Sequence, residues 1–308
     1  MTTTAWGARL PALRARGFLI QDLAAVALGL KPMCRSGFTR RDDETLAGLR
    51  AFAGAAGLAL TVYESAYESA EPMFALTESE TALAEYQAAL EAKQAAVRDE
   101  DTARATREIG RLLGYPSCCV EAFSAHEGER SGAPYPAAVR ERSGPGPYPW
   151  PANFLYNFHS RSAHGQAELR RLLARGYRAM DAYVLPWIPC CFDCAASLAY
   201  ADALLPALEA HDPAFCAGLR QLLSAPVLVF GEWGLVPLTD ARRDGRRLAY
   251  GAAVDLKTLA PAPALTLLTG GDALEPAGDG RWEVLAGGRA RGAVSALLLE
   301  FSASTRRD

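Results

Sequence analysis

Five of the seven cysteines lie in two short segments, and in each segment they follow a proline. Residues 189–194 read PCCFDC, and residues 115–119 read YPSCC. Proline favours the first turn of a helix, where unpaired amides and the positive end of the helix dipole lower the pKa of a nearby thiol. We therefore expect each proline to begin a helix, and the two segments to meet as halves of one thiolate site.

The spacing within the later segment suits chelation. On a helix that begins at Pro189, Cys190 and Cys194 are four residues apart and share a face, and Cys191 lies three residues before Cys194. Cys118 and Cys119 supply further thiols after Pro116. Two such helix starts facing each other predict four or five thiolates around a common point.

Four kinds of thiol chemistry fit this pattern. The leading hypothesis is an iron–sulfur cluster of the 4Fe-4S type, because a cluster held by three cysteines leaves one iron open as a Lewis acid. Zinc is the alternative: it takes four thiolates, or three and a histidine, and mainly ties distant segments together. Cys191 and Cys194 also form a CxxC redox pair, and the simplest interpretation is a set of buried, inert cysteines.

The motifs LGYPxCC at residues 113–119 and PCxxxC at residues 189–194 resemble those of an uncharacterised prokaryotic family known mainly from archaea. The resemblance covers residues from about 34 to 200. It implies a shared cysteine site with Cys119, Cys190 and Cys194 as ligands, and it implies no particular reaction. Cys191 departs from the small polar residue that the resemblance implies there. Cys118 or Cys191 would then be a fourth ligand or a reactive thiol.

A segment that mixes aromatic and polar side chains, NFLYNFHSR at residues 153–161, is the second candidate site. The pKa of histidine suits His159 to acid–base work, and the guanidinium of Arg161 suits a carboxylate or phosphate. Asn157 shares a face with Asn153 if the segment is helical. The alternative is a capped surface turn. Together with the thiols, these groups predict an enzyme acting on a small anionic molecule, whereas the rival hypothesis is a zinc-stapled scaffold without catalysis.

Two further cysteines stand alone in the sequence. Cys34 follows the helix stop at Pro32 and is either an additional ligand or a small buried hydrophobe. Cys216 lies between Phe215 and Ala217, which favours burial in the core.

Composition limits the classes of protein that fit. The chain has 308 residues, of which 50% are hydrophobic and 22% charged, as in ordinary globular proteins. A net charge of −3 creates no field that attracts nucleic acid. The start lacks a basic segment followed by an apolar run, and no stretch approaches the length of a membrane span. We expect a cytoplasmic protein with no membrane or nucleic-acid partner, in which disulfides are disfavoured.

The helices and strands expected around these residues indicate an α+β fold in three parts. Residues 1–78 form an α/β unit, residues 79–225 a helical domain that carries the cysteine site, and residues 226–303 an antiparallel β domain. Hydrophobic periodicity and breakers predict helices over 18–30, 43–56, 79–97, 101–114, 166–175, 194–208 and 215–223, and one after Pro116.

Strands are predicted in the first and last parts. Alternating apolar residues indicate strands at 58–63 and 72–77. In the last part they are expected at 227–230, 234–238, 247–250, 282–285 and 296–299, with tight turns at Asp244-Gly245 and Asp279-Gly280. Residues 132–151 are rich in glycine and proline and predict a long loop.

Overall fold

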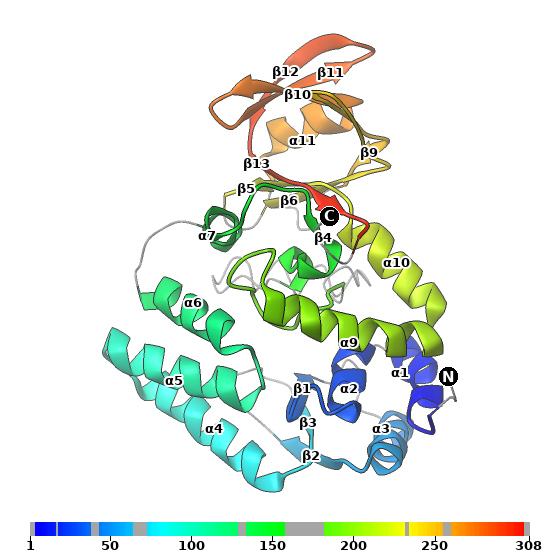
Figure 1. The fold of residues 1–308 in the computed structure, drawn as a ribbon, viewed down its shortest axis with the longest axis vertical. Helices are drawn as coiled ribbons and strands as arrows, with labels where there is room; N and C mark the ends of the chain where they lie inside the picture. The colour runs from blue at the N-terminus through cyan, green and yellow to red at the C-terminus, as the bar shows by residue number, and fades with distance from the viewer. Residues whose placement is uncertain are drawn as a thin grey trace. The chain divides into compact units, whose positions relative to one another are not determined.

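The computed structural model describes residues 4–16, 18–37, 43–63, 73–128, 134–157, 182–231, 234–254 and 260–304. The fold is α+β, as predicted (Figure 1). It divides into two compact units. The first comprises Met1–Ser131, Val184–Cys190 and Cys194–Ala217, and the second comprises Gly132–Tyr183, Cys191–Asp193 and Gly218–Asp308. The predicted boundary at residue 78 therefore lies inside the first unit, and the three-part division stays a prediction.

The first unit begins with short helices and a three-stranded antiparallel sheet. The helices are η1 (Gly7–Arg9), α1 (Leu10–Ala15), α2 (Ile20–Ala27) and α3 (Asp43–Ala56), and the strands are β1 (Met33–Gly37), β2 (Ala59–Tyr63) and β3 (Met73–Thr77). The sheet order is β1-β3-β2. Every residue of the central strand β3 is buried. The predicted helices and strands of this region are confirmed, while η1, α1 and β1 were not predicted. Strand β1 places Cys34 opposite Leu76.

Three helices continue this unit as neighbours in sequence and in space (Figure 1). They are α4 (Glu80–Ala95), α5 (Asp99–Leu112) and α6 (Ser117–Gly128). Helix α5 carries acidic residues in its first turn and Arg111 in its last, which complements its dipole. Helix α9 (Ala195–His211) packs against α2, and α10 (Pro213–Leu223) follows it.

The expectation of one long loop over residues 132–151 is wrong in its first half. Helix α7 spans Tyr135–Arg142, with Pro136 in its first turn and Val139 buried. Proline is tolerated in a first turn, and the alanine, arginine and glutamate that follow are good helix formers. From Ser143 to Pro147 the chain is non-helical, as expected.

The second unit contains β4 (Tyr148–Pro149), η2 (Trp150–Ala152), η3 (Leu155–Asn157) and the C-terminal strands. A five-stranded sheet has the order β12-β11-β10-β8-β7, and a four-stranded sheet has the order β13-β5-β6-β9. The strands are β5 (Val227–Phe230), β6 (Gly234–Thr239), β7 (Arg242–Asp244), β8 (Arg247–Ala249), β9 (Ala252–Ala253), β10 (Ala273–Gly278), β11 (Arg281–Ala286), β12 (Arg289–Ser295), β13 (Leu297–Leu299) and β14 (Phe301–Ser302). Strand β14 pairs in parallel with β4, and helix α11 spans Ala262–Thr269.

The predicted antiparallel sheet and its turns are confirmed. Asp279 and Gly280 join β10 to β11 with φ angles of 50° and 69°, the positive values that a two-residue hairpin turn requires. Gly245 lies in the β7–β8 turn with φ of 55°. The core of this region includes Leu228, Val236 and Leu274.

Among the described residues, no helix has both the length and the apolar character needed to cross a membrane.

Candidate metal centre

The turn between α5 and α6 sets the position of the first cysteine pair. The amides of Gly114 and Tyr115 donate to the carbonyls of Arg111 and Gly110, so the helix ends in a Schellman motif with Gly114 at φ of 72°. Pro116 follows, and its carbonyl accepts hydrogen bonds from the amides of Cys119 and Val120. Cys118 and Cys119 therefore lie in the first turn of α6, as predicted.

The second cysteine segment is not a helix, contrary to the expectation from Pro189. Helix α9 begins only at Ala195, and Cys194 is its N-cap residue. The amide of Cys190 donates to Cys119 Sγ at 3.3 Å, and the amide of Phe192 donates to Ser143 Oγ at 2.8 Å. These tertiary hydrogen bonds, with the burial of the Phe192 side chain, hold residues 190–193 in an irregular loop.

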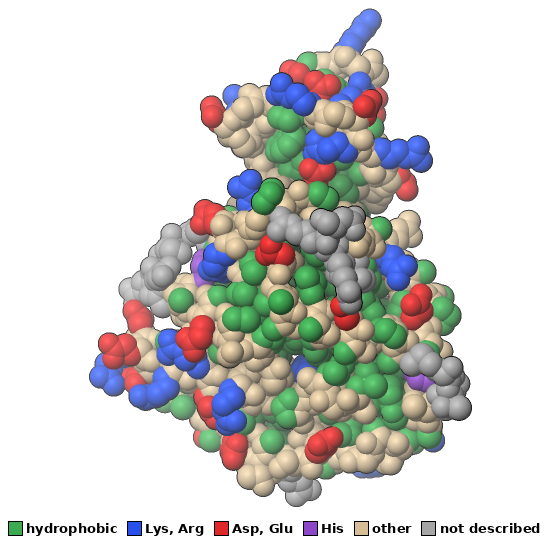
Figure 2. Space-filling view, viewed as in Figure 1, with side chains coloured by type: hydrophobic (Ala, Val, Ile, Leu, Met, Phe, Trp, Pro, Cys, Tyr) green, Lys and Arg blue, Asp and Glu red, His purple; other side chains and the backbone are tan. Residues whose placement is uncertain are grey.

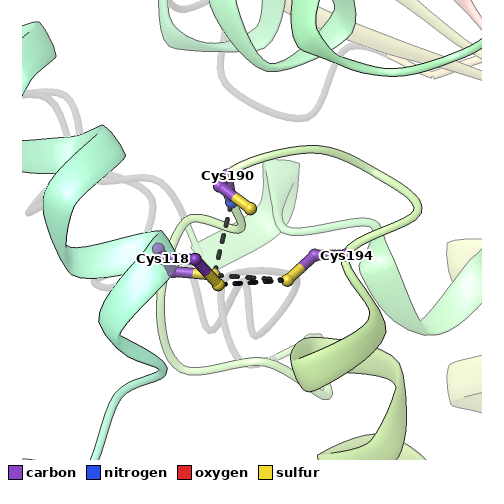
Figure 3. A group of neighbouring side chains, drawn as sticks. Cys118, Cys190 and Cys194 are labelled. Atoms are coloured by element: carbon purple, nitrogen blue, oxygen red, sulfur yellow. Dashed lines mark hydrogen bonds between the residues drawn. The ribbon is translucent and has the colours of Figure 1, made fainter.

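Four thiols converge at this point of the first unit. The sulfur-to-sulfur distances are 3.9 Å from Cys118 to Cys119, 3.7 Å from Cys118 to Cys194, and 3.6 Å from Cys119 to Cys194. With Cys190, all four Sγ atoms lie within 4.8 Å of one another. Figure 3 shows Cys118 on α6, Cys190 in the loop and Cys194 beside the start of α9. This group, Cys118, Cys119, Cys190 and Cys194, is called the thiol cluster below, and it is able to bind a metal ion.

The hydrogen bond between the buried sulfurs of Cys119 and Cys194 shifts their two pKa values in opposite directions. The hydrogen bond from Cys119 lowers the pKa of Cys194 to about 4, against the opposing effect of burial. The same hydrogen bond, and burial after it, raises the pKa of the Cys119 thiol. One thiolate therefore forms readily in this pair, whereas a second negative sulfur beside it needs a cation to stabilise it.

Two residues that the sequence analysis missed support these sulfurs. Ser197 Oγ lies 3.4 Å from Cys119 Sγ, and Trp187 Nε1 donates to the same oxygen at 3.0 Å. A thiolate has no proton to donate, so the Ser197 hydroxyl donates to Cys119 Sγ when that sulfur is ionised. A serine in the first turn of an otherwise Ala- and Leu-rich helix was the signal available in the sequence.

Exposure differs among the members of the thiol cluster. Cys119 and Cys194 are buried, Cys190 is partly buried, and Cys118 is exposed. All seven cysteines of the chain are free thiols. The site is therefore closed by protein around two sulfurs and open to solvent at one.

The other candidate site residues from the sequence lie outside the thiol cluster or outside the described residues. Cys191 is partly buried and is not a member of the thiol cluster. Cys34 is buried in β1 and Cys216 is buried in α10, and both also lie outside the cluster. His159 and Arg161 fall outside the described residues. Asn157 ends η3, and its side chain is likewise outside what the structure describes.

A buried ion pair, Lys31 and Asp22, lies beside Tyr115, which precedes the first cysteines of the thiol cluster in the sequence. Lys31 Nζ is 3.3 Å from Asp22 Oδ1 and 5.4 Å from the centre of the Tyr115 ring. Trp187 contacts the rings of both Tyr115 and Tyr200. Burial is the largest effect on the pKa of Lys31 and lowers it, but Asp22, Tyr115 and Cys34 together outweigh burial, and the net shift is upward.

A cavity of about 650 Å³ opens beside the start of α6, where Tyr115 and Ser117 form part of its wall. Three arginines of α5 line it, and each is paired with an acid: Arg104 with Asp101, Arg107 with Glu121, and Arg111 with Glu108. Figure 2 shows basic and acidic side chains intermixed over this part of the surface. The cavity therefore has no surplus positive charge to attract an anion.

The chain matches no protein-family model, no curated protein and no solved structure. The resemblance to the uncharacterised prokaryotic family stays a prediction from the two cysteine motifs.

Proposed function

We propose that the thiol cluster binds one zinc ion in a tetrahedral site of four thiolates, which fixes α6, the loop before Cys194 and the start of α9 to one another. The observation that carries the proposal is the sulfur spacing. Four sulfurs at about 2.3 Å from a zinc ion are about 3.8 Å from one another. The three sulfur separations of 3.6, 3.7 and 3.9 Å among Cys118, Cys119 and Cys194 lie at that value.

The same spacing argues against a cubane cluster at this position. In a 4Fe-4S cluster each cysteine binds a different iron, so the iron–iron separation is added to the distance between sulfurs. Four Sγ atoms within 4.8 Å of one another suit a single ion better. The iron–sulfur hypothesis is therefore the second candidate, and metal analysis decides between them.

The surroundings also suit a dianionic centre, which four thiolates and one Zn²⁺ form together. The N-terminal ends of α6 and α9 direct their positive dipole ends to the sulfurs, and Cys119 Sγ accepts hydrogen bonds from Cys190 and Ser197. In a reducing compartment such as the cytoplasm, where we place the protein, the thiolates remain available to the metal.

Elemental analysis of protein purified without oxygen tests this proposal. We expect about one zinc per chain and no broad absorption at about 400 nm, the region where iron–sulfur clusters absorb. Cys194→Ala is expected to lose most of the metal, while Cys191→Ala keeps it. A brown protein with several irons per chain would replace zinc by the iron–sulfur alternative, and full metal content in Cys194→Ala would remove that residue from the site.

A site of four thiolates leaves no coordination position open, so the proposed role is structural. The predicted enzyme that uses His159, Arg161 and a small anionic substrate remains a separate hypothesis.

A further inference from the structure

Cys118 differs from the other members of the thiol cluster in its surroundings. Its side chain is exposed. Within the described part of the chain, Cys118 Sγ has hydrogen-bond contacts only with the sulfurs of Cys119 and Cys194. By contrast, Cys119 Sγ receives the Cys190 amide and the Ser197 hydroxyl.

These differences determine which sulfur reacts. Hydrogen bonds to a metal-bound thiolate draw charge away from the sulfur and make it a weaker nucleophile. Burial in addition keeps reagents away from Cys119 and Cys194. Among the described residues, Cys118 combines an exposed sulfur with the absence of an N–H or O–H donor to it, so it keeps more negative charge than Cys119 and is the sulfur that a solute reaches.

We propose that Cys118 is a modification site, at which the metal-bound thiolate reacts with hydroperoxides and the reaction releases the metal. This inference rests on the proposed zinc centre. The Cys118 sulfur attacks the terminal oxygen of the hydroperoxide, and the O–O bond breaks. The leaving alkoxide, or hydroxide when the oxidant is hydrogen peroxide, takes a proton to become an alcohol or water. Cys118 is then a sulfenic acid, which is no longer a good zinc ligand.

The second step forms a disulfide with Cys194. Its thiolate, 3.7 Å from Cys118 Sγ, attacks the sulfenic sulfur, the S–O bond breaks, and the hydroxide takes a proton to leave as water. The two thiolates lose two electrons, and the hydroperoxide gains both. Zinc keeps two of its four ligands and dissociates.

Chain geometry selects Cys194 over Cys119 as the partner. Neighbouring residues have Cα atoms about 3.8 Å apart across a trans peptide, below the separation of about 4.4 Å or more that disulfides usually need. Cys118 and Cys119 are neighbours, whereas Cys194 comes from a different segment.

The experiment treats the metal-loaded protein with limiting hydrogen peroxide and follows zinc release with a coloured chelator. Peptide mapping then identifies the oxidised residues. We expect a Cys118–Cys194 disulfide that forms in parallel with zinc release. In Cys118→Ser, three thiolates and a hydroxyl or water retain zinc, and release slows by at least about tenfold. Cys191→Ser, outside the thiol cluster, is the matched control and should release zinc at the unchanged rate.

A second measurement keeps the proposal testable if Cys118→Ser does not load zinc. Substoichiometric N-ethylmaleimide is applied to the unaltered protein, and the labelled cysteines are mapped. Labelling of Cys118 before the other three cluster members supports the proposal, and labelling of any of these three first, or of all four equally, overturns it. Metal content is measured before any reagent is added. Absence of metal at that stage defeats the zinc centre, whereas bound metal with a different first-reacting cluster cysteine defeats only the role of Cys118.

Discussion

Cys34 and Cys119 are both buried thiols of the first unit, and their neighbours make them chemically different groups. Cys34 lies in β1, where burial, and after it the charge of Asp22, raises its pKa to about 12 while Lys31 acts in the opposite direction. Cys119 has the Cys194 sulfur at 3.6 Å, accepts a hydrogen bond from the Cys190 amide and lies 3.4 Å from Ser197 Oγ. The pKa of both thiols is raised, but Cys119 also lies beside a second sulfur and oriented donors, which prepare it to hold a metal together with its neighbours.

Removing Cys34 and Cys119 in turn is the strongest test of the difference between them. Cys119→Ala deletes a proposed ligand whose sulfur contacts two other sulfurs, so we expect loss of nearly all bound metal and of about 3 kcal/mol or more of unfolding free energy. Cys34→Ala should keep the full metal content and cost about 1 kcal/mol, as a small cavity in the core does. Elemental analysis and chemical denaturation with and without a chelator measure both effects. Loss of metal from Cys34→Ala, or its retention in Cys119→Ala, would contradict the distinction.

A close contact between glycine and proline brings the chain segments of these two thiols together. Gly114 has φ of 72°, and a Cβ at this position would lie 2.4 Å from Pro32 Cδ, two residues before Cys34. Gly57 has the same φ of 72° and also ends a helix, but a Cβ there meets nothing within 4 Å. Comparing Gly114 with Gly57 therefore separates the cost of the left-handed backbone from the cost of the contact with Pro32.

We therefore expect Gly114→Ala to destabilise the protein more than Gly57→Ala. Gly57→Ala should cost about 1 kcal/mol, from the left-handed backbone alone. Gly114→Ala should cost about 2–4 kcal/mol, because the rigid proline ring must also move. Urea denaturation of the two variants gives the difference directly. Equal losses would show that the Pro32 contact yields easily, and that the α5–α6 turn does not depend on it.

The sequence predicted the elements whose signals are local. The periodic residues 43–56 form α3 with the predicted bounds, and the Asp279-Gly280 pair forms a hairpin turn, since both depend on residues adjacent in the chain. The two prolines followed by cysteines correctly indicated where the thiols would gather.

The errors arose where distant residues decide the conformation. A proline such as Pro189 is compatible with a helix start and with a loop. The amides of Cys190 and Phe192 donate to Cys119 and Ser143, which lie 71 and 49 residues away in the sequence. No local pattern contains these partners. For the same reason the sequence did not predict the contact between Ser197 and Cys119, which lie 78 residues apart.

A smaller effect is expected when a hydrogen-bonding neighbour of the sulfurs, rather than a proposed ligand, is removed. Ser197→Ala removes the hydroxyl next to Cys119 Sγ, and we expect metal affinity to fall about tenfold, as for other supporting groups of metal ligands. Trp187→Phe removes only the N–H that orients this hydroxyl, so a smaller loss is expected in the same direction. Competition with a chelator of known affinity measures both variants. If neither affinity changes, hydrogen bonding does not distinguish Cys119 from Cys34.

The smallest expected effect concerns Cys34 at alkaline pH. Its pKa is about 12 in the folded protein against an ordinary value of 9.0, so above pH 9 the unfolded chain releases a proton that the folded protein keeps. Unfolding is then favoured as the pH rises, and the unfolding free energy falls by up to about 1.4 kcal/mol per pH unit from this group. Cys34→Ala lacks this contribution, whereas the Lys31–Asp22 pair is present in both proteins. Denaturation at pH 8, 9 and 10 should therefore show a steeper loss of stability in the unaltered protein by about 1 kcal/mol between pH 9 and 10. Parallel profiles would mean that the Cys34 thiol ionises as easily in the folded protein as in the unfolded one, and that burial does not account for its difference from Cys119.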